Sequence, residues 1–170
     1  AVLAWTAVEL DHDVRLAASG NPAQRALIQK MFRAEVDALG RLSHPNVVRL
    51  LGHADEGADG CGCVLVYELL SERNLHDRLF SSAEQPALTA EARLAVAVGV
   101  ARGLCHVHGL LDAAAASPML HRDLSSKNVG FGIVGGEAKL VDFGLAKSIQ
   151  DPTKSLLSIT GGAAIGTPGY

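Results

Sequence analysis

Two hydrophobic patterns, one typical of strands and one of a helix, divide the first part of the chain. Residues 2–10, "VLAWTAVEL", are apolar, β-prone in part and free of Gly and Pro, which predicts a strand. Asn21 and Pro22 then supply an N-cap and a first helical residue. Residues 44–52 predict a turn and a strand, and residues 63–70 predict a strand apolar enough to be central. This part of the chain is therefore predicted to be a small sheet with one helix.

The predicted helix carries a carboxylate on its apolar face. Four apolar residues share that face at helical spacing: Ile28, Phe32, Leu39 and Leu42. Glu35 lies on the same stripe, between Phe32 and Leu39. A carboxylate that faces a core is costly unless another group pairs with it. We therefore expect Glu35 to have a partner elsewhere in the chain.

A long helix over residues 88–109, capped by Thr89, opens the second part of the chain. Five of its residues share one face: Leu94, Val98, Ala101, Cys105 and His108. Two short strands are predicted to flank the polar stretch 120–131, and residues 138–144 end a third. The sequence from Leu145 onward is rich in Ser, Thr and Gly, which predicts a loop. The order of these elements indicates an α+β fold with two lobes.

Composition narrows the function classes. The chain has 170 residues, 48% of them hydrophobic, and a net charge of −3, which gives no basis for binding nucleic acid or anionic membranes. Cys61 and Cys63 form a single C-x-C pair that cannot close a zinc site, so free thiols are expected. The chain has neither a long apolar run nor a signal-peptide pattern. We expect an intracellular location, either in the cytoplasm or on the cytoplasmic side of a membrane receptor, with no membrane span in this chain.

The stretch "LHRDLSSKNVGF" (residues 120–131, the polar loop) contains the residue types of a phosphoryl-transfer site. Asp123 and Asn128 are five positions apart, and Asp142 follows fourteen residues later at the end of a predicted strand. Asp and Asn oxygens are ligands that Mg²⁺ prefers, and an Asp that does not bind metal can accept a proton. Lys127 can neutralise phosphate charge. The alternative is a polar surface loop without function.

These residues also stand in motifs that resemble those of protein kinase domains. "HRDLSSKN" (121–128) matches the H-R-D-x-x-x-x-N motif, "DFG" (142–144) matches the metal-binding motif, and "GTPGY" (166–170) resembles the substrate loop. The sequences of these motifs are most similar to those of plant receptor-like and Pelle-type kinases, and the resemblance covers nearly the whole chain. It implies an incomplete bilobal fold. Residues 1–70 would be part of the N-lobe, and residues 71–170 would be part of the C-lobe up to the substrate loop.

The resemblance implies transfer of the γ-phosphate of ATP, with Mg²⁺, to a Ser or Thr of a protein substrate. Asp123 would be the catalytic base, and Lys127 would contact the γ-phosphate. Asn128 and Asp142 would hold Mg²⁺. Thr167 in "GTPGY" resembles the serine/threonine class rather than the tyrosine class.

The resemblance also assigns residues to nucleotide binding. Glu35 corresponds to the glutamate of the αC helix, which in the family pairs with a strand lysine and orients the ATP phosphates. Tyr67 would be the gatekeeper, and backbone groups of Glu68 and Leu70 would meet the adenine ring. Four side chains would stack into the regulatory spine that joins the lobes: Leu39, Leu50, His121 and Phe143.

The sequence departs from the family pattern in the nucleotide-binding region. Thr6 stands where the strand lysine is expected, and no G-x-G-x-x-G precedes it. Gly130 stands where a bulky apolar residue usually lies beneath the adenine ring. Three hypotheses therefore stand: a protein kinase, a pseudokinase that acts as a binding or scaffold module, or a fragment without a function of its own.

Overall fold

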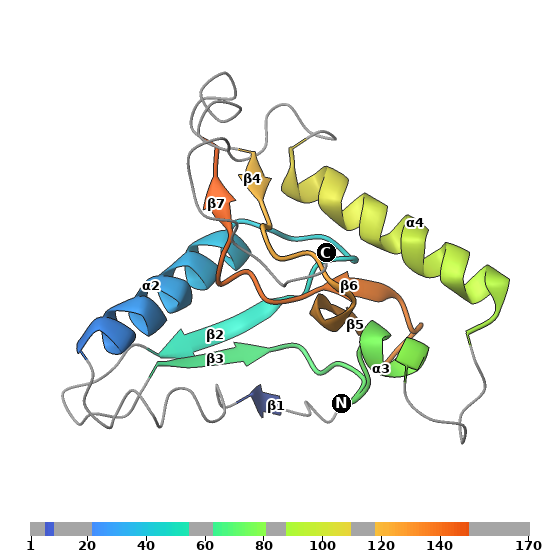
Figure 1. Ribbon diagram of the computed structural model, residues 1–170, viewed down its shortest axis with the longest axis horizontal. Coiled ribbons are helices and arrows are strands. Elements are labelled where there is room, and N and C mark those ends of the chain that lie inside the picture. Colours follow the sequence, from blue (N-terminus) through green and yellow to red (C-terminus); the bar gives the residue numbers. More distant parts are fainter. Residues whose placement is uncertain (1–5, 9–21, 55–62, 81–87, 110–117, 150–170) are drawn as a thin grey trace.

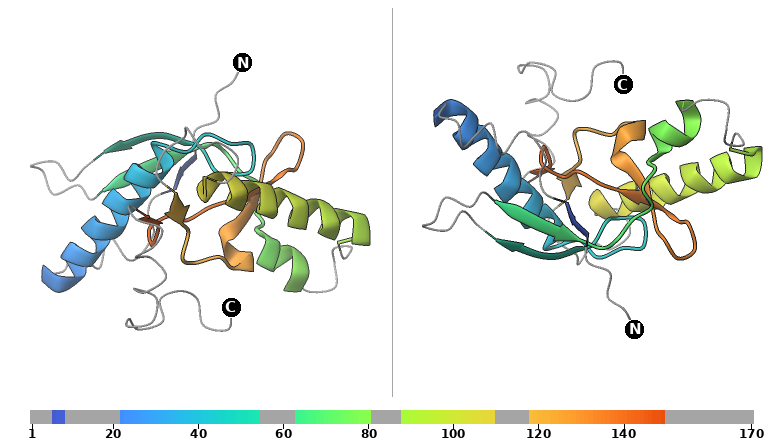
Figure 2. Two further views of the ribbon diagram at one scale, coloured as in Figure 1. Left: turned by 90° about the horizontal axis from the view of Figure 1, so that it is seen from above. Right: turned by 90° about the horizontal axis from the view of Figure 1, so that it is seen from below.

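The computed structural model describes residues 6–8, 22–54, 63–80, 88–109 and 118–149. Helix α2 (Pro22–Leu39) and helix α4 (Ala90–Val107) lie at opposite ends of the molecule, with short strands between them (Figures 1 and 2). The "GTPGY" motif lies outside the described residues. No helix in the described ranges is long and apolar enough to cross a membrane.

The first part of the chain forms the predicted sheet and helix. Helix α2 (Pro22–Leu39) begins at the proline that the sequence indicates, and strands β1 (Thr6–Val8), β2 (Leu50–Ala54) and β3 (Val64–Tyr67) form an antiparallel sheet. The order β1-β3-β2 makes β3 the central strand, as predicted. Leu65 of β3 is fully buried and lies in one hydrophobic cluster with Phe32 of α2. The apolar stripe of the helix therefore packs on the sheet.

The described residues of the second part form two helices, one 3₁₀ turn and two pairs of short strands. The elements in chain order are α3 (Leu75–Phe80), α4 (Ala90–Val107), β4 (Met119–Leu120), η1 (Ser126–Asn128), β5 (Val129–Phe131), β6 (Ala138–Leu140) and β7 (Lys147–Ser148). Strand β5 pairs with β6, and β4 pairs with β7. The prediction of a loop from Leu145 onward is wrong at β7. This strand exists because its backbone bonds to β4, a contact that its own polar sequence does not indicate.

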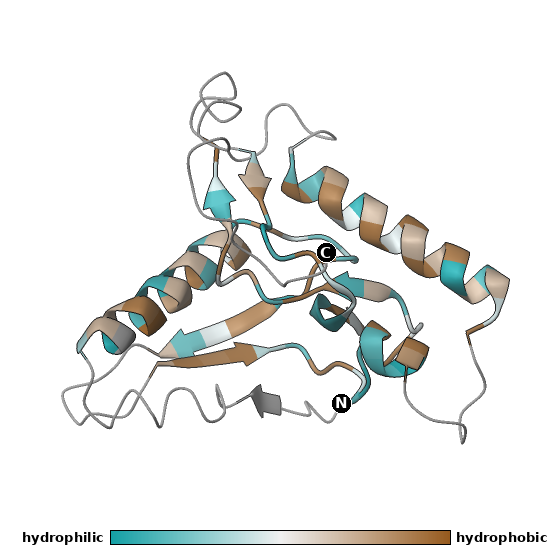
Figure 3. Cartoon of the chain, in the orientation of Figure 1, coloured by the Kyte–Doolittle hydropathy of each residue, from teal (hydrophilic) through white to brown (hydrophobic). Residues whose placement is uncertain are grey.

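Helix α4 packs through glycines rather than through its most apolar stripe. Thr89 caps the helix as predicted, and its side chain accepts a hydrogen bond from the Ala92 N–H at 3.2 Å. The side chain of Leu94 is nevertheless 66% exposed, whereas Gly99 and Gly103 are buried. A Cβ at Gly103 would lie 2.7 Å from the Asn46 carbonyl oxygen, so the helix approaches its neighbours where it has no side chains. Figure 3 shows apolar residues along the whole length of α4.

One hydrophobic cluster joins the two parts of the molecule. It consists of buried residues from α2, α4, β4, β6 and the connections between them: Ala38, Leu39, Val47, Val48, Val107, Met119, Leu140 and Phe143. The segment after α2 also bonds directly to β6, because the Val48 N–H donates to the Leu140 carbonyl oxygen at 2.9 Å. The Leu140 N–H in turn donates to the Asn46 carbonyl oxygen at 2.9 Å. This connection fixes the strand that leads into Asp142.

Candidate active site

The polar loop brings Asp123 and Asn128 into direct contact. The Asn128 Nδ2 donates to the Asp123 backbone carbonyl at 2.9 Å and to the Asp123 Oδ2 at 3.0 Å. The single turn of η1 makes this possible, because it folds the chain back on itself between the two residues. The predicted grouping of a carboxylate and an amide on one site is therefore present in the structure.

Asp142 lies next to this pair through the pairing of β5 with β6. The Val141 N–H donates to the Asn128 carbonyl oxygen at 3.1 Å, one residue before Asp142. Asp142 is exposed and has a φ of 62°, in the left-handed region that residues other than glycine rarely adopt. Its Oδ1 accepts a hydrogen bond from the Gly144 N–H at 3.3 Å. Strained backbone of this kind gathers at functional sites.

His121 connects the polar loop to the strand that carries Asp142. Its ring is 2% exposed and lies 4.6 Å from the ring of Phe143. The Nε2 lies 3.0 Å from the Val141 carbonyl oxygen, and the Nδ1 accepts a long bond, 3.4 Å, from the Asp123 N–H. A neutral imidazole satisfies both contacts. His121 and Phe143 therefore pack together, as the predicted spine requires; Leu39 shares the cluster of Phe143, and Leu50 packs against it.

Burial lowers the pKa of the His121 imidazole, and its hydrogen bond to the Val141 carbonyl opposes that shift only in part. The pKa of His44 is lowered as well, by burial and by the positive charge of nearby basic groups, beginning with His106. The unfolded chain then binds protons more readily than the folded chain, so folding stability should decrease as pH falls through about 6.5. Denaturant unfolding from about pH 7.5 to about pH 5.5 measures this decrease. In the variant His121→Phe, the free energy of unfolding should decrease less over this pH range. A decrease as large as in the unchanged chain would show that His121 does not cause it.

Glu35 has the partner that its position on α2 predicts, but the partner is not a lysine. Its side chain is buried, and its Oε1 accepts hydrogen bonds from the Tyr67 hydroxyl at 2.6 Å and from the Phe143 N–H at 3.3 Å. Burial raises the pKa of the Glu35 carboxyl, the negative charge of Asp142 raises it further, and the two hydrogen bonds oppose the shift. Thr6, at the position of the expected lysine, lies opposite Tyr67 in the β1–β3 register.

Tyr67→Phe should destabilise the fold by about 1–3 kcal/mol, because it leaves the buried Glu35 carboxylate with one long backbone hydrogen bond. Denaturant unfolding measures the loss. The matched control is Tyr67→Phe in a chain that already carries Glu35→Gln. A buried neutral amide costs less free energy than a buried carboxylate when a hydrogen bond is removed, so Tyr67→Phe should lower the stability less in this background. Equal losses in both backgrounds would show that the hydroxyl does not act through Glu35.

A buried lysine, Lys139, binds both the segment after α2 and the segment after β3. The sequence patterns did not predict this contact. Lys139 of β6 is 5% exposed, and its Nζ lies 3.1 Å from the Glu68 Oε1 and 3.4 Å from the Glu137 Oε1. The Nζ also donates to the Pro45 carbonyl oxygen at 2.9 Å. The Arg49 N–H donates to the same Glu68 oxygen at 2.9 Å. A lysine set among apolar residues in "AKLVDFG" was the available signal.

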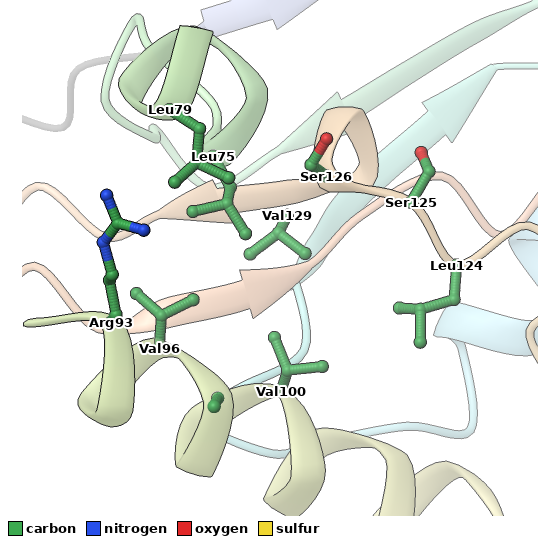
Figure 4. Close-up of a pocket in the computed structure, with 10 residues that line it drawn as sticks. Leu75, Leu79, Arg93, Val96, Val100, Leu124, Ser125, Ser126 and Val129 are labelled. Carbon is green, nitrogen blue, oxygen red and sulfur yellow. The ribbon is translucent and has the colours of Figure 1, made fainter. Parts of the chain in front are cut away.

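Lys127 precedes Asn128 on η1, and it is exposed. A pocket of about 480 Å³ lies between α3 and α4 (Figure 4). The residues that line it come mainly from these helices, the polar loop and β5: Leu75, Leu79, Arg93, Val96, Ala97, Val100, Leu124, Ser125, Ser126 and Val129. None of the predicted site residues lines this pocket, although Leu124, Ser125 and Ser126 of the polar loop do.

Comparison with known proteins agrees with the motifs. The chain is 37% identical over 142 residues to "Probable serine/threonine-protein kinase PBL28" of Arabidopsis thaliana, a match that covers 84% of this chain and 35% of that protein. It is 39% identical over 141 residues to a "Probable LRR receptor-like serine/threonine-protein kinase" of the same plant, covering 83% of this chain and 14% of that protein. The chain therefore spans about a third or less of the length of these curated relatives.

The family model described as "Protein tyrosine and serine/threonine kinase" matches residues 11–163, which include the HRD and DFG motifs. The mixture of helices and small antiparallel sheets agrees with the kinase-type α+β fold that the resemblance implies. The chain belongs to the protein tyrosine and serine/threonine kinase family, and the relatives that it matches are named serine/threonine kinases.

Proposed function

We propose that this chain is the part of a protein kinase that transfers the γ-phosphate of ATP, with Mg²⁺, to a Ser or Thr hydroxyl of a protein substrate. The observation that carries the proposal is the contact of Asn128 with Asp123, with Asp142 beside them through the Val141–Asn128 hydrogen bond. An intracellular location is part of the proposal. So is the assignment of residues 1–70 and 71–170 to the N-lobe and the C-lobe.

Asp123 is the proposed general base. It accepts the proton of the substrate hydroxyl as the hydroxyl oxygen bonds to the γ-phosphorus and the bond between that phosphorus and the β–γ bridging oxygen breaks, which releases ADP. The half-buried carboxylate is held by the Asn128 amide. Lys127 of the same turn would neutralise charge on the transferred phosphoryl group.

Asn128 and Asp142 are the proposed magnesium ligands. The Asn128 amide nitrogen donates to Asp123, which leaves the Oδ1 of Asn128 for a cation. Asp142 accepts the Gly144 N–H with one of its two carboxylate oxygens, which leaves the other. Mg²⁺ normally takes one or two protein oxygens and completes its shell with water and substrate phosphates, so two ligands fit this ion. Within the described residues no group of three or more His, Cys, Asp or Glu side chains could hold a metal by itself. Bound Mg²⁺ would neutralise phosphate charge.

Backbone groups of Glu68 and Leu70 are the proposed contacts to adenine. The Glu68 N–H donates to the Arg49 carbonyl oxygen at 3.0 Å, and the Lys139 ion pair holds the Glu68 side chain. In the part of the chain that the structure describes, no hydrogen bond uses the N–H of Leu70. Both residues therefore sit on a segment that is fixed by neighbours and still offers a donor to a nucleotide.

A pseudokinase is the second candidate, and Thr6 is the observation that favours it. The register of β1 places Thr6 opposite Tyr67, whose hydroxyl binds Glu35 in the absence of a strand lysine. In the part of the chain that the structure describes, Glu35 then has no ion pair with a cation of the kind that, in the family, helps it to orient the α- and β-phosphates. Such a protein would bind nucleotide or a protein partner without turnover.

The test combines ATP binding with phosphate transfer. Calorimetry with Mg·ATP measures binding, and ATP labelled at its terminal phosphate, offered with a broad set of proteins, measures transfer to Ser or Thr. Transfer supports the kinase, whereas binding without transfer supports the pseudokinase. A chain that neither binds nor transfers contradicts both proposals.

A further inference from the structure

We infer that Leu70, rather than residue 130, supplies the apolar surface on which the adenine ring rests; this inference rests on the proposed nucleotide-binding function. A flat aromatic ligand gains affinity from apolar side chains that cover its faces. Gly130 offers no side chain for this purpose, although its place in β5 is the one where the family resemblance expects a bulky residue.

The space beside Gly130 is already filled. A Cβ at Gly130 would lie 2.8 Å from the Leu70 Cδ1 and 3.4 Å from the Val141 Cγ1. The first distance is shorter than real Cβ contacts allow, so a side chain at position 130 would compete with the end of the Leu70 side chain. The missing side chain in β5 therefore leaves no empty hole, because Leu70 occupies the volume.

Two backbone contacts hold Leu70 in this place. Leu70 forms an antiparallel bridge with Gly132, and the Ser71 N–H donates to the Phe131 carbonyl oxygen at 2.8 Å. The segment after β3 is thus tied to the residues that directly follow Gly130. The Leu70 side chain also packs against the hydrophobic cluster that joins the two parts of the molecule. Its position is determined by β5 and by the core together.

Exposure decides which of the two residues a ligand can contact. Gly130 is buried, whereas Leu70 and Val141 are only half-buried. A ligand in this region therefore meets the Leu70 side chain, and the Leu70 N–H discussed above lies on the same residue. Val141 continues the apolar surface and directly precedes Asp142, the proposed magnesium ligand. Base, phosphates and metal ligand would then follow one another along a single surface.

The test is a double-substitution cycle in the full chain: Leu70→Ala, Gly130→Leu and the two combined. Calorimetry measures the affinity for ATP and for adenosine, which carries the base without phosphates, and thermal unfolding measures stability. Leu70→Ala should weaken both ligands by about tenfold, since it removes apolar contact from the base. Gly130→Leu alone should lower the melting temperature by about 2–4 °C through overpacking against Leu70.

The combined variant should recover most of the affinity and stability, because a leucine at position 130 then fills the volume that Leu70→Ala vacates. Leu94→Ala is the matched control: it removes the same atoms from a side chain that is 66% exposed on α4, and it should change neither measurement.

Three results would overturn the inference, and they separate it from the proposed function. If Leu70→Ala binds ATP and adenosine as tightly as the unchanged chain, the inference fails while the proposed function stands. If the losses in the two single variants simply add in the combined variant, the residues do not share one volume and the inference fails. If the unchanged chain binds neither ligand, the proposed nucleotide site fails, and the role of Leu70 fails with it.

Discussion

Replacing Asp123 with Asn is expected to lower the rate of phosphoryl transfer by about 10²–10⁴-fold while ATP binding stays nearly unchanged. The substitution removes the carboxylate that is the proposed general base. It keeps an oxygen that can receive the hydrogen bond that the Asn128 Nδ2 now gives to the Asp123 Oδ2. The local fold of the polar loop should therefore survive. Transfer of labelled phosphate to protein, measured beside calorimetric ATP binding, separates the two effects.

Asp37→Asn is the control for this experiment. Asp37 is an exposed carboxylate on α2 that pairs with Arg41 at 2.6 Å, so its replacement removes a negative charge that belongs to a surface ion pair. It should leave transfer unchanged. A transfer rate that is the same in Asp123→Asn as in the unchanged chain would rule out Asp123 as the base. Unfolding curves for both variants establish that any loss of activity is not a loss of fold.

Replacing Thr6 with Lys is expected to raise the transfer rate by up to about 10²–10³-fold, the size of effect that one preorganised donor contributes at a developing charge. Position 6 lies opposite Tyr67, and the Tyr67 hydroxyl bonds to the Glu35 Oε1. A lysine at position 6 would bring a cation to this strand position. It would lower the raised pKa of Glu35 and place positive charge where the family orients the ATP phosphates.

The control for Thr6→Lys is Ala7→Lys, which adds the same charge at the neighbouring position of β1. Only Thr6→Lys should raise the rate, and Asp123→Asn in the Thr6→Lys background should abolish the gain. If the unchanged chain is inactive and Thr6→Lys is active, the natural protein is a pseudokinase. If Thr6→Lys gains nothing over Ala7→Lys, the absent lysine does not limit catalysis in this chain.

The sequence alone predicted those features that depend on residues close together in the chain. Pro22 starts α2, and Thr89 caps α4, because capping and the first helical turn involve only a few neighbouring residues. Asp123 and Asn128 meet because the loop between them is short enough for one turn of η1 to join them. The motifs that contain these residues also identified the family.

Periodicity predicted that Glu35 would be buried and paired, but it could not name the partner. Tyr67 lies 32 positions away, and only the packing of α2 on the sheet brings its hydroxyl to Glu35. The ion pair of Lys139 with Glu68 likewise depends on β6 lying against the segment after β3. A charged residue in an apolar stretch indicates that a partner exists, whereas the identity of that partner is a non-local property.

The tertiary structure decided two further points against the sequence patterns. Apolar periodicity predicts a face of α4 that includes the exposed Leu94, because it gives no weight to glycine; the close approach of the helix to the Asn46 carbonyl instead selects the face with Gly103. Gly130 indicates a missing side chain when the sequence is read alone. In the fold, the Leu70 methyl group fills that volume, since residues distant in sequence share one packed interior.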